Sequence, residues 1–181
     1  MALGDLETIA RLAARGDARA FESLCLALQD DVWRYCCALL DDRELAREAA
    51  QETFARAVGA IRRFHGDAPV RLWLLVLARR SSAAVLRREC RHRDARAHGI
   101  EPDRPLSDHC GAVDLVELVN ALPPDQRQAF TLTQVLGLSY REAAAVSGCA
   151  VGTIRSRVFR SRERLIAALA DDGNQRGEGV Q

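Results

Sequence analysis

The chain has 181 residues, 48% of them hydrophobic, and a formal net charge of +1. This length fits one or two compact domains with a buried core. The longest apolar run, 72–78, is far shorter than the roughly 20 residues of a membrane span, and no apolar segment of signal-peptide type opens the sequence. These features argue against a membrane-spanning protein and predict a cytoplasmic one.

Apolar residues at helical spacing predict a helical bundle in residues 1–92. A first helix ends at Gly16, and Asp17 caps a second helix that extends to about residue 39 with a break near Asp30. Asp41 and Glu44 have the spacing of a capping box and begin a third helix. After a turn at 65–69, a fourth helix is expected over 70–91. No strand-like alternation occurs, so the predicted fold class is all-α.

The periodicity disappears over 93–112, where glycine and proline punctuate a polar stretch, and this predicts a flexible linker. Helices resume at about residue 113, and a further helix follows Pro123 and Pro124 and is closed by Gly137. Residues 113–170 are thus expected to form a second small helical domain. Residues 171–181 are expected to be a disordered tail.

Within the second domain, the segment 139–165 has the pattern of a helix-turn-helix. Ser139 and Glu142 form a capping box that begins one helix, and Gly148 ends that helix with a residue that tolerates a left-handed backbone. A second helix with five arginines and one acid follows from Val151. A solvated basic helix is the alternative, but it does not account for the capped helix and the glycine turn that precede the arginines.

The second of these helices has two distinct faces. One is a predicted buried stripe of apolar residues at three-, four- and seven-residue spacings: Val151, Ile154, Val158, Leu165 and Leu169. The other is formed by two i,i+4 pairs on adjoining rows, Arg155 with Phe159 and Ser156 with Arg160. Because arginine donors match guanine edges or phosphates, this second face can enter the major groove of DNA.

Charge is sorted along the chain. Residues 62–96 contain ten arginines against three acids, whereas 41–52 contain five acids against two arginines and 101–125 contain six acids against one arginine. The basic block favours nucleic acid and the acidic blocks favour a basic protein, although a solvated surface explains the acidic blocks equally well. Phe64, His65 and Trp73 lie among the arginines, where planar groups can receive the bases of a melted strand. Trp73 fits either this role or a place in the core.

The six cysteines are expected to be reduced in a cytoplasmic protein. Three of them fall in the apolar pattern of the second helix and act there as small hydrophobes. Cys90 with His92, and His109 with Cys110, are the only hints of a metal site, and no Cys-x-x-Cys pair accompanies them. We expect no metal ion and no cofactor.

Four stretches resemble the extracytoplasmic-function (ECF) sigma factors, the two-domain initiation subunits of bacterial RNA polymerase. They are, in chain order, REAAQETFARA (47–57), RFHGDAPVRLWLLVLARR (63–80), LPPDQRQAFTLTQVLGLSYREAAAVSG (122–148) and CAVGTIRSRVFRSRERL (149–165). Within that family the chain is most similar to an actinobacterial sigma-C-like group. The resemblance implies that 1–92 is sigma region 2, that 113–170 is sigma region 4, and that the linker lies along the RNA exit path of the polymerase.

The resemblance also implies which residues meet promoter DNA. Reading of the minus-thirty-five element as duplex is implied for Thr153, Arg155, Ser156, Arg157, Phe159 and Arg160, with Thr153 and Arg157 on the DNA backbone. Binding of the melted minus-ten strand is implied for Arg63, Phe64, His65, Arg71, Arg79, Arg80, Arg87 and Arg88. The loop 65–70 is implied to capture a flipped base.

Further partners follow from the acidic block. Glu48 and Glu52 share one helical face with Gln51 beside it, a surface suited to a basic partner helix. By resemblance that partner is the clamp-helix coiled coil of the largest polymerase subunit, and the second domain binds the polymerase flap. An anti-sigma factor is a further candidate partner. A solvated helix face is the alternative for these acids.

Two other functional classes explain less. A stand-alone helix-turn-helix regulator accounts for neither the basic block 62–91 nor the face formed by Gln51 and Glu52. A metal-dependent enzyme would rely on His92, His98, His109 and Cys110, which lie in or near the linker without a constellation of paired carboxylates. We therefore expect a transcription initiation factor with no catalytic chemistry of its own.

Overall fold

A computed structural model describes residues 3–96 and 115–177, and every regular element within these two ranges is helical, which confirms the all-α prediction. The elements are α1 (Leu3–Ala14), α2 (Ala18–Leu39), α3 (Arg43–Ala60), η1 (Ile61–Arg63), α4 (Val70–Arg96), α5 (Leu115–Asn120), α6 (Pro124–Phe130), η2 (Thr131–Val135), α7 (Tyr140–Ser147) and α8 (Val151–Gly177).

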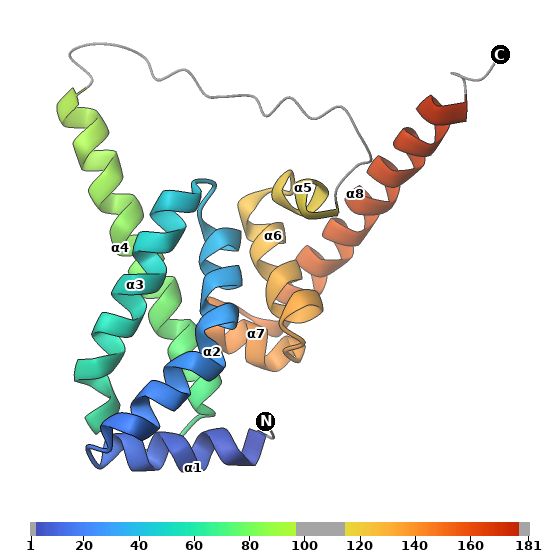
Figure 1. The fold of residues 1–181 in the computed structure, drawn as a ribbon. Coiled ribbons are helices and arrows are strands. Elements are labelled where there is room, and N and C mark those ends of the chain that lie inside the picture. The colour runs from blue at the N-terminus through green and yellow to red at the C-terminus, as the bar shows by residue number, and fades with distance from the viewer. Residues whose placement is uncertain (1–2, 97–114, 178–181) are drawn as a thin grey trace.

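Helices α2, α3 and α4 pack along one another as the N-terminal domain, and α1 lies across one end of this bundle (Figure 1). Apolar side chains at helical spacing form its core, among them Leu24, Val32, Leu75 and Val85, all fully buried. The expected chain of helices is therefore present. Helix α4 continues to Arg96, past residue 93 where the linker was expected to begin.

Two helix starts test the capping predictions. Asp17 caps α2 as predicted, because its carboxylate accepts from the backbone N–H groups of Arg19 and Ala20 at 2.9 and 3.1 Å. The cap predicted at Asp41 is wrong by one residue. Asp42 caps α3 instead, because its carboxylate accepts from the backbone N–H groups of Glu44 and Leu45 in the first turn. Asp41 lies outside the helix.

The break predicted near Asp30 is also wrong, because α2 is a single helix. No glycine or proline interrupts it, and the buried residues Leu28, Val32 and Tyr35 keep one face toward the core through this region. The next residue, Asp31, forms an ion pair at 2.6 Å with Arg71 of α4 and so joins the two helices.

Helices α5 to α8 form the C-terminal domain. A π-helical turn, η2, follows α6 directly, and Gly137 then reverses the chain with a φ of +69°. The capping box of Ser139 and Glu142 is present as predicted, and the hydrogen bonds from the Ser139 hydroxyl and backbone N–H hold the pKa of Glu142 below its usual value. Gly148 ends α7 with a φ of +68°, as predicted.

The buried stripe of α8 is shorter than predicted. Ile154, Val158 and Leu165 are buried against the rest of the domain, whereas Val151 and Leu169 are exposed. These two positions lie toward the ends of the contact that α8 makes with α6 and α7, so periodicity alone overestimated how much of the helix is covered. Helix α8 extends to Gly177, into the segment expected to be a tail.

The two domains pack against each other (Figure 1). Helix α2 meets α6 and η2, and α4 meets α7, so that buried residues of both domains belong to one hydrophobic cluster. Within the described ranges, none of the helices combines the length and the apolar content needed to cross a bilayer.

Candidate nucleic-acid and polymerase interfaces

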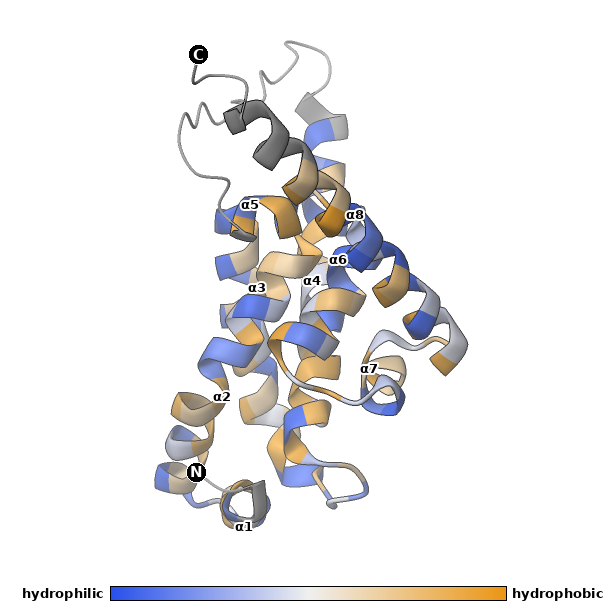
Figure 2. Cartoon of the chain, turned by 90° about the vertical axis from the view of Figure 1, so that its right-hand side faces the viewer, coloured by the Kyte–Doolittle hydropathy of each residue, from blue (hydrophilic) through white to orange (hydrophobic). Residues whose placement is uncertain are grey.

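The exposed face of α8 carries the residues expected to read duplex DNA. Arg155, Ser156, Phe159 and Arg160 are all exposed, and Phe159 is 62% exposed although it is a large apolar residue. Figure 2 shows mostly hydrophilic residues along the part of α8 that follows α7. The structure thus brings these four side chains together on one open helical face, supported from behind by the buried stripe.

Two further residues expected at this face are engaged within the domain. Arg157 is half-buried, and its Nε lies 3.1 Å from Oδ2 of Asp125 in α6. Thr153 is half-buried, and its carbonyl oxygen accepts a hydrogen bond of 3.0 Å from the Ser156 hydroxyl. Both residues lie at the border between the core and the exposed face.

Residues expected to hold a melted strand divide into an exposed and a covered group. The exposed group follows η1, the loop after it and the outer side of α4, and comprises Arg63, His65, Arg80, Arg87 and Arg88. Arg88 also forms an ion pair with Glu48 of α3. This group forms a basic surface along the N-terminal domain that is open to solvent.

Phe64 was expected to contact the strand, but the structure places it in the core at 9% exposure. Its ring packs on Trp73, with ring centroids 5.4 Å apart and planes tilted by 56°, which is a favourable aromatic geometry. Trp73 is half-buried against the same cluster. Of the two roles left open for Trp73, the structure favours packing, and the two rings brace the junction of η1 and α4.

Arg71 and Arg79 of α4 form the covered group, because the C-terminal domain lies over them. The Arg71 guanidinium donates to the carbonyl oxygen of Leu136 at 2.7 Å while Nε pairs with Asp31. The Arg79 guanidinium lies close to Gly148: a Cβ atom added to Gly148 would be only 3.2 Å from Nη2 of Arg79. Nε of Arg79 is buried without a hydrogen-bond partner. Both arginines are therefore part of the domain contact in this arrangement.

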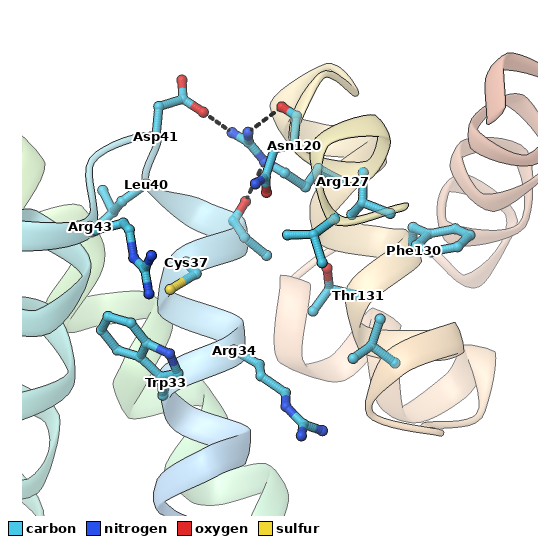
Figure 3. Close-up of a pocket in the computed structure, with 14 residues that line it drawn as sticks. Trp33, Arg34, Cys37, Leu40, Asp41, Arg43, Asn120, Arg127, Phe130 and Thr131 are labelled. Atoms are coloured by element: carbon cyan, nitrogen blue, oxygen red, sulfur yellow. Dashed lines mark hydrogen bonds and ion pairs between the residues drawn. The ribbon is translucent and has the colours of Figure 1, made fainter. Parts of the chain in front are cut away.

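A second part of the domain contact joins α2 to α6. The Gln128 side chain donates to the hydroxyl oxygen of Tyr35 at 2.7 Å, and burial raises the pKa of Tyr35. Arg127, whose side chain is only 4% exposed, donates to the carbonyl oxygens of Ala38 at 3.0 Å and Asn120 at 2.7 Å. It also pairs with Asp41, the residue just before the cap of α3 (Figure 3).

Beside Arg127 lies a groove of about 610 Å³ between α2 on one side and α5, α6 and η2 on the other (Figure 3). Its walls include the apolar side chains of Trp33, Leu40, Val119 and Phe130, and its rim includes Arg34. Figure 3 shows Trp33, Arg34 and Cys37 on α2, with Phe130 and Thr131 on the other side of the opening. The groove is thus an apolar surface with positive charge at its edge.

Helix α3, which carries the acidic residues, lies on the side of the N-terminal domain away from the domain contact (Figure 1). Gln51 is exposed, and Glu48 and Glu52 are partly exposed. Glu52 pairs with Arg56 at 2.8 Å, and Glu48 pairs with Arg88. Surface pairs of this kind contribute little stability, so both carboxylates can exchange their arginines for a basic partner at small cost.

No cluster of potential metal ligands occurs among the residues that the structure describes. His98, His109 and Cys110 lie outside the described ranges. Burial raises the pKa of the Cys36 thiol to about 11, which makes it an inert core residue, whereas Cys90 is exposed.

Sequence reasoning missed the domain contact. Tyr35, Arg127 and Gln128 are polar residues at positions where a helix could face either solvent or a neighbour, and their partners lie about ninety positions away. Helical periodicity shows which face of a helix is buried but not what covers it, so no local signal could have identified these pairs.

Comparison with known protein families gives two matches along the chain. Residues 24–92 match the model for sigma-70 region 2, and residues 112–165 match the model for sigma-70 region 4. The chain is 45% identical to the ECF RNA polymerase sigma factor SigC of Mycobacterium tuberculosis, over 91% of each chain. It is 33% identical to the RNA polymerase sigma-H factor of Pseudomonas aeruginosa, over 86% of this chain and 89% of that one.

Two solved structures are similar in fold. One is the sigma factor RpoE in complex with the anti-sigma factor NepR from Bartonella quintana, with a TM-score of 0.69, 29% identity, and coverage of 84% of this chain and 98% of that one. The other is CnrH in complex with the cytosolic domain of CnrY, with a TM-score of 0.67, 26% identity, and coverage of 92% and 97%.

Proposed function

The chain belongs to the ECF sigma factors of the sigma-70 family, and from this we propose that it reads the minus-thirty-five element as duplex DNA and holds the minus-ten element as a melted strand. Sigma factors of this family direct promoter-specific initiation by RNA polymerase and have no enzymatic activity of their own. We propose that this chain likewise performs no catalysis and supplies only binding energy. Its cytoplasmic location remains a prediction.

The exposed face of α8 is the observation that carries the proposal. A helix-turn-helix places its second helix in the major groove, and Arg155 and Arg160 offer two-pronged donors to base edges or phosphates there. Phe159 supplies an apolar surface for a thymine methyl group. Thr153 and Arg157, at the border of the face, are positioned for the DNA backbone.

The basic surface of the N-terminal domain supports the second half of the proposal. Arg63, Arg80, Arg87 and Arg88 can follow the phosphates of a single strand, and His65 can stack on an unpaired base. Arg71 and Arg79 join this surface once the C-terminal domain moves away from α4. In this proposal the N-terminal domain, α1 to α4, holds the melted strand, and the C-terminal domain, α5 to α8, reads the duplex.

Core RNA polymerase is the partner proposed for α3 and for the C-terminal domain. Glu48, Gln51 and Glu52 present acidic and amide groups to the basic clamp helices of the largest subunit, and the C-terminal domain meets the flap. Both contacts together would hold the two DNA-reading surfaces at a fixed separation on one promoter.

The test is transcription from a pool of templates randomised across both promoter elements, each linked to a barcode in its transcript. Purified bacterial core RNA polymerase should enrich two short elements at a fixed separation only when this chain is added. Absence of enrichment would refute the proposal. Tight binding of one duplex element without polymerase would favour the stand-alone regulator instead.

An anti-sigma protein is a second proposed partner, because one solved structure of similar fold holds a sigma factor with its anti-sigma factor, and the other holds CnrH with the cytosolic domain of CnrY. The groove beside Arg127 offers an apolar floor, and its arginine rim favours a helix with acidic flanks. Val119→Glu should release the chain from inhibition by a co-expressed anti-sigma candidate while transcription by purified holoenzyme stays unchanged. Continued inhibition would exclude the groove as the docking surface.

A further inference from the structure

A hollow of about 440 Å³ lies between helix α1 and the loop that joins η1 to α4. Two residues of α1, Glu7 and Arg11, line one side of it, and the loop residues 65–69 line the other. Its volume falls within the range of roughly 300–1,000 Å³ that is usual for small-molecule sites. Helix α1 lies before the stretch that matches the region 2 model, so the family match assigns no role to this wall of the hollow.

Helix α1 is fixed in place by its apolar side. Leu6, Ala10 and Ala13 are buried in the core of the N-terminal domain. Glu7 and Arg11 are separated by one helical turn and therefore share a face next to this buried side. That face is turned toward the loop, so the two polar side chains have a defined position relative to it.

A hydrogen bond ties the loop to α1. The Glu7 carboxylate accepts from the backbone N–H of Val70 at 2.8 Å, across 63 positions of sequence. Val70 is the first residue of α4, so its N–H has no partner within its own helix, and because Val70 is fully buried water cannot readily supply one. Glu7 thus caps α4 from a different helix and fixes where the loop ends. At the other end Gly66 has a φ of +83°, which lets the chain turn sharply into the hollow.

The groups around the hollow suit a nucleobase. Arg11 and His65 are exposed planar groups that can stack on a base or donate to its edge, and Glu7 and Asp67 add carboxylate acceptors. An anionic phosphate would meet two carboxylates here, whereas a neutral base can use the donors and acceptors together.

We propose that α1 forms one wall of the pocket that receives an unstacked base of the melted strand, with Arg11 in contact with the base and Glu7 as the positioning residue for the loop. The inference rests on the proposed function and extends it, since it adds the N-terminal helix to the strand-reading site. Sequence preference at one position of the minus-ten element then depends on residues that precede region 2.

The test uses holoenzyme reconstituted from core RNA polymerase and the full chain, transcribing the pool randomised across both promoter elements. Arg11→Ala should lower the base preference at a single minus-ten position by about 5-fold or more, the lower end of what one base contact contributes. The preference at the minus-thirty-five element should not change. Arg15→Ala, which removes an exposed arginine just after the last residue of α1 and outside the hollow, is the matched control and should behave as wild type.

Glu7 is tested by a pair of variants. Glu7→Ala should relax the same single position, because Val70 loses its acceptor, whereas Glu7→Gln should restore the preference, because the amide oxygen can still accept from the Val70 N–H. The melting temperature of each variant, compared with that of wild type, tests whether the domain is intact. A general loss of folding, with Gln no better than Ala, would assign Glu7 to stability alone and overturn its positioning role.

The outcomes separate the two levels of the proposal. If wild-type holoenzyme enriches promoter elements but Arg11→Ala keeps every preference, the inference about α1 is wrong and the proposed function stands. A uniform loss of transcription over all sequences would identify Arg11 as a phosphate contact and would also overturn it. If wild type enriches nothing, the proposed function fails, and the inference with it.

Discussion

Replacement of Arg127 by alanine should destabilise the folded chain by about 2–4 kcal/mol, because a buried guanidinium holds together the ends of two helices. Its hydrogen bonds of 3.0 and 2.7 Å go to the carbonyl oxygens of Ala38 and Asn120, which lie at the C-terminal ends of α2 and α5. These ends carry partial negative charge, and they have carbonyl groups without intrahelical partners. A bond from a charged donor to such a group is worth about 1.5–3 kcal/mol when buried and less when partly exposed.

The ion pair with Asp41 adds little to this value. The Asp41 side chain is 55% exposed, and pairs at such positions contribute at most about 1 kcal/mol. Asp41→Asn is therefore the matched control. Arg127→Lys should be intermediate, because an ammonium keeps the charge but lacks the planar fork that reaches acceptors in three directions.

Urea unfolding followed by circular dichroism gives the three free energies, and the denaturant slope shows whether the unfolded states are comparable. We expect Arg127→Ala to lose several times as much stability as Asp41→Asn. If the two variants lost the same amount, the bonds to the helix ends would contribute nothing and the reasoning would be refuted.

The other predictions concern separate surfaces. Arg160→Ala should weaken promoter binding by ~1–3 kcal/mol and relax one minus-thirty-five position in the randomised pool, whereas Arg162→Ala, whose side chain bonds within the domain, should change neither. Glu52→Arg should reduce co-purification with core RNA polymerase, whereas the control Glu22→Arg, at an exposed position of α2, should not. If both variants co-purified with equal amounts of core RNA polymerase, the polymerase contact would lie elsewhere. Because the folded pKa of Cys36 lies above its ordinary value of 9.0, the stability it contributes is complete below pH 9 and is lost as pH rises toward about 11. Cys36→Ala should remove that part of the decline in a pH series of urea unfolding, and an unchanged decline would assign it to other groups.

Local chemistry predicted much of this fold. The capping box of Ser139 and Glu142 and the glycine at 148 are signals contained within ten residues, and the structure has all three in place. The capping pattern at Asp41 was ambiguous because Asp42 stands beside it; in the structure Asp42 caps α3, and Asp41 pairs with Arg127.

Prediction failed where a residue's partner is distant in sequence. Phe64 lies among arginines and was expected at the DNA, yet its place is decided by packing on Trp73. A break was expected near Asp30, yet α2 is continuous there, and the neighbouring Asp31 pairs with Arg71 forty positions away. The role of Glu7 depends likewise on an N–H group that no spacing rule connects to it.

While α7 rests on α4, the guanidinium groups of Arg71 and Arg79 cannot meet a strand. A ligand that needs these two groups binds only molecules in which the two domains have separated. Its apparent affinity is therefore reduced in proportion to the fraction of molecules in that separated state. Weakening the domain contact, for example by a substitution at Arg127, should therefore raise the affinity for single-stranded DNA while it lowers the melting temperature. In this chain, contacts that stabilise the closed pair of domains lower the affinity for a melted strand.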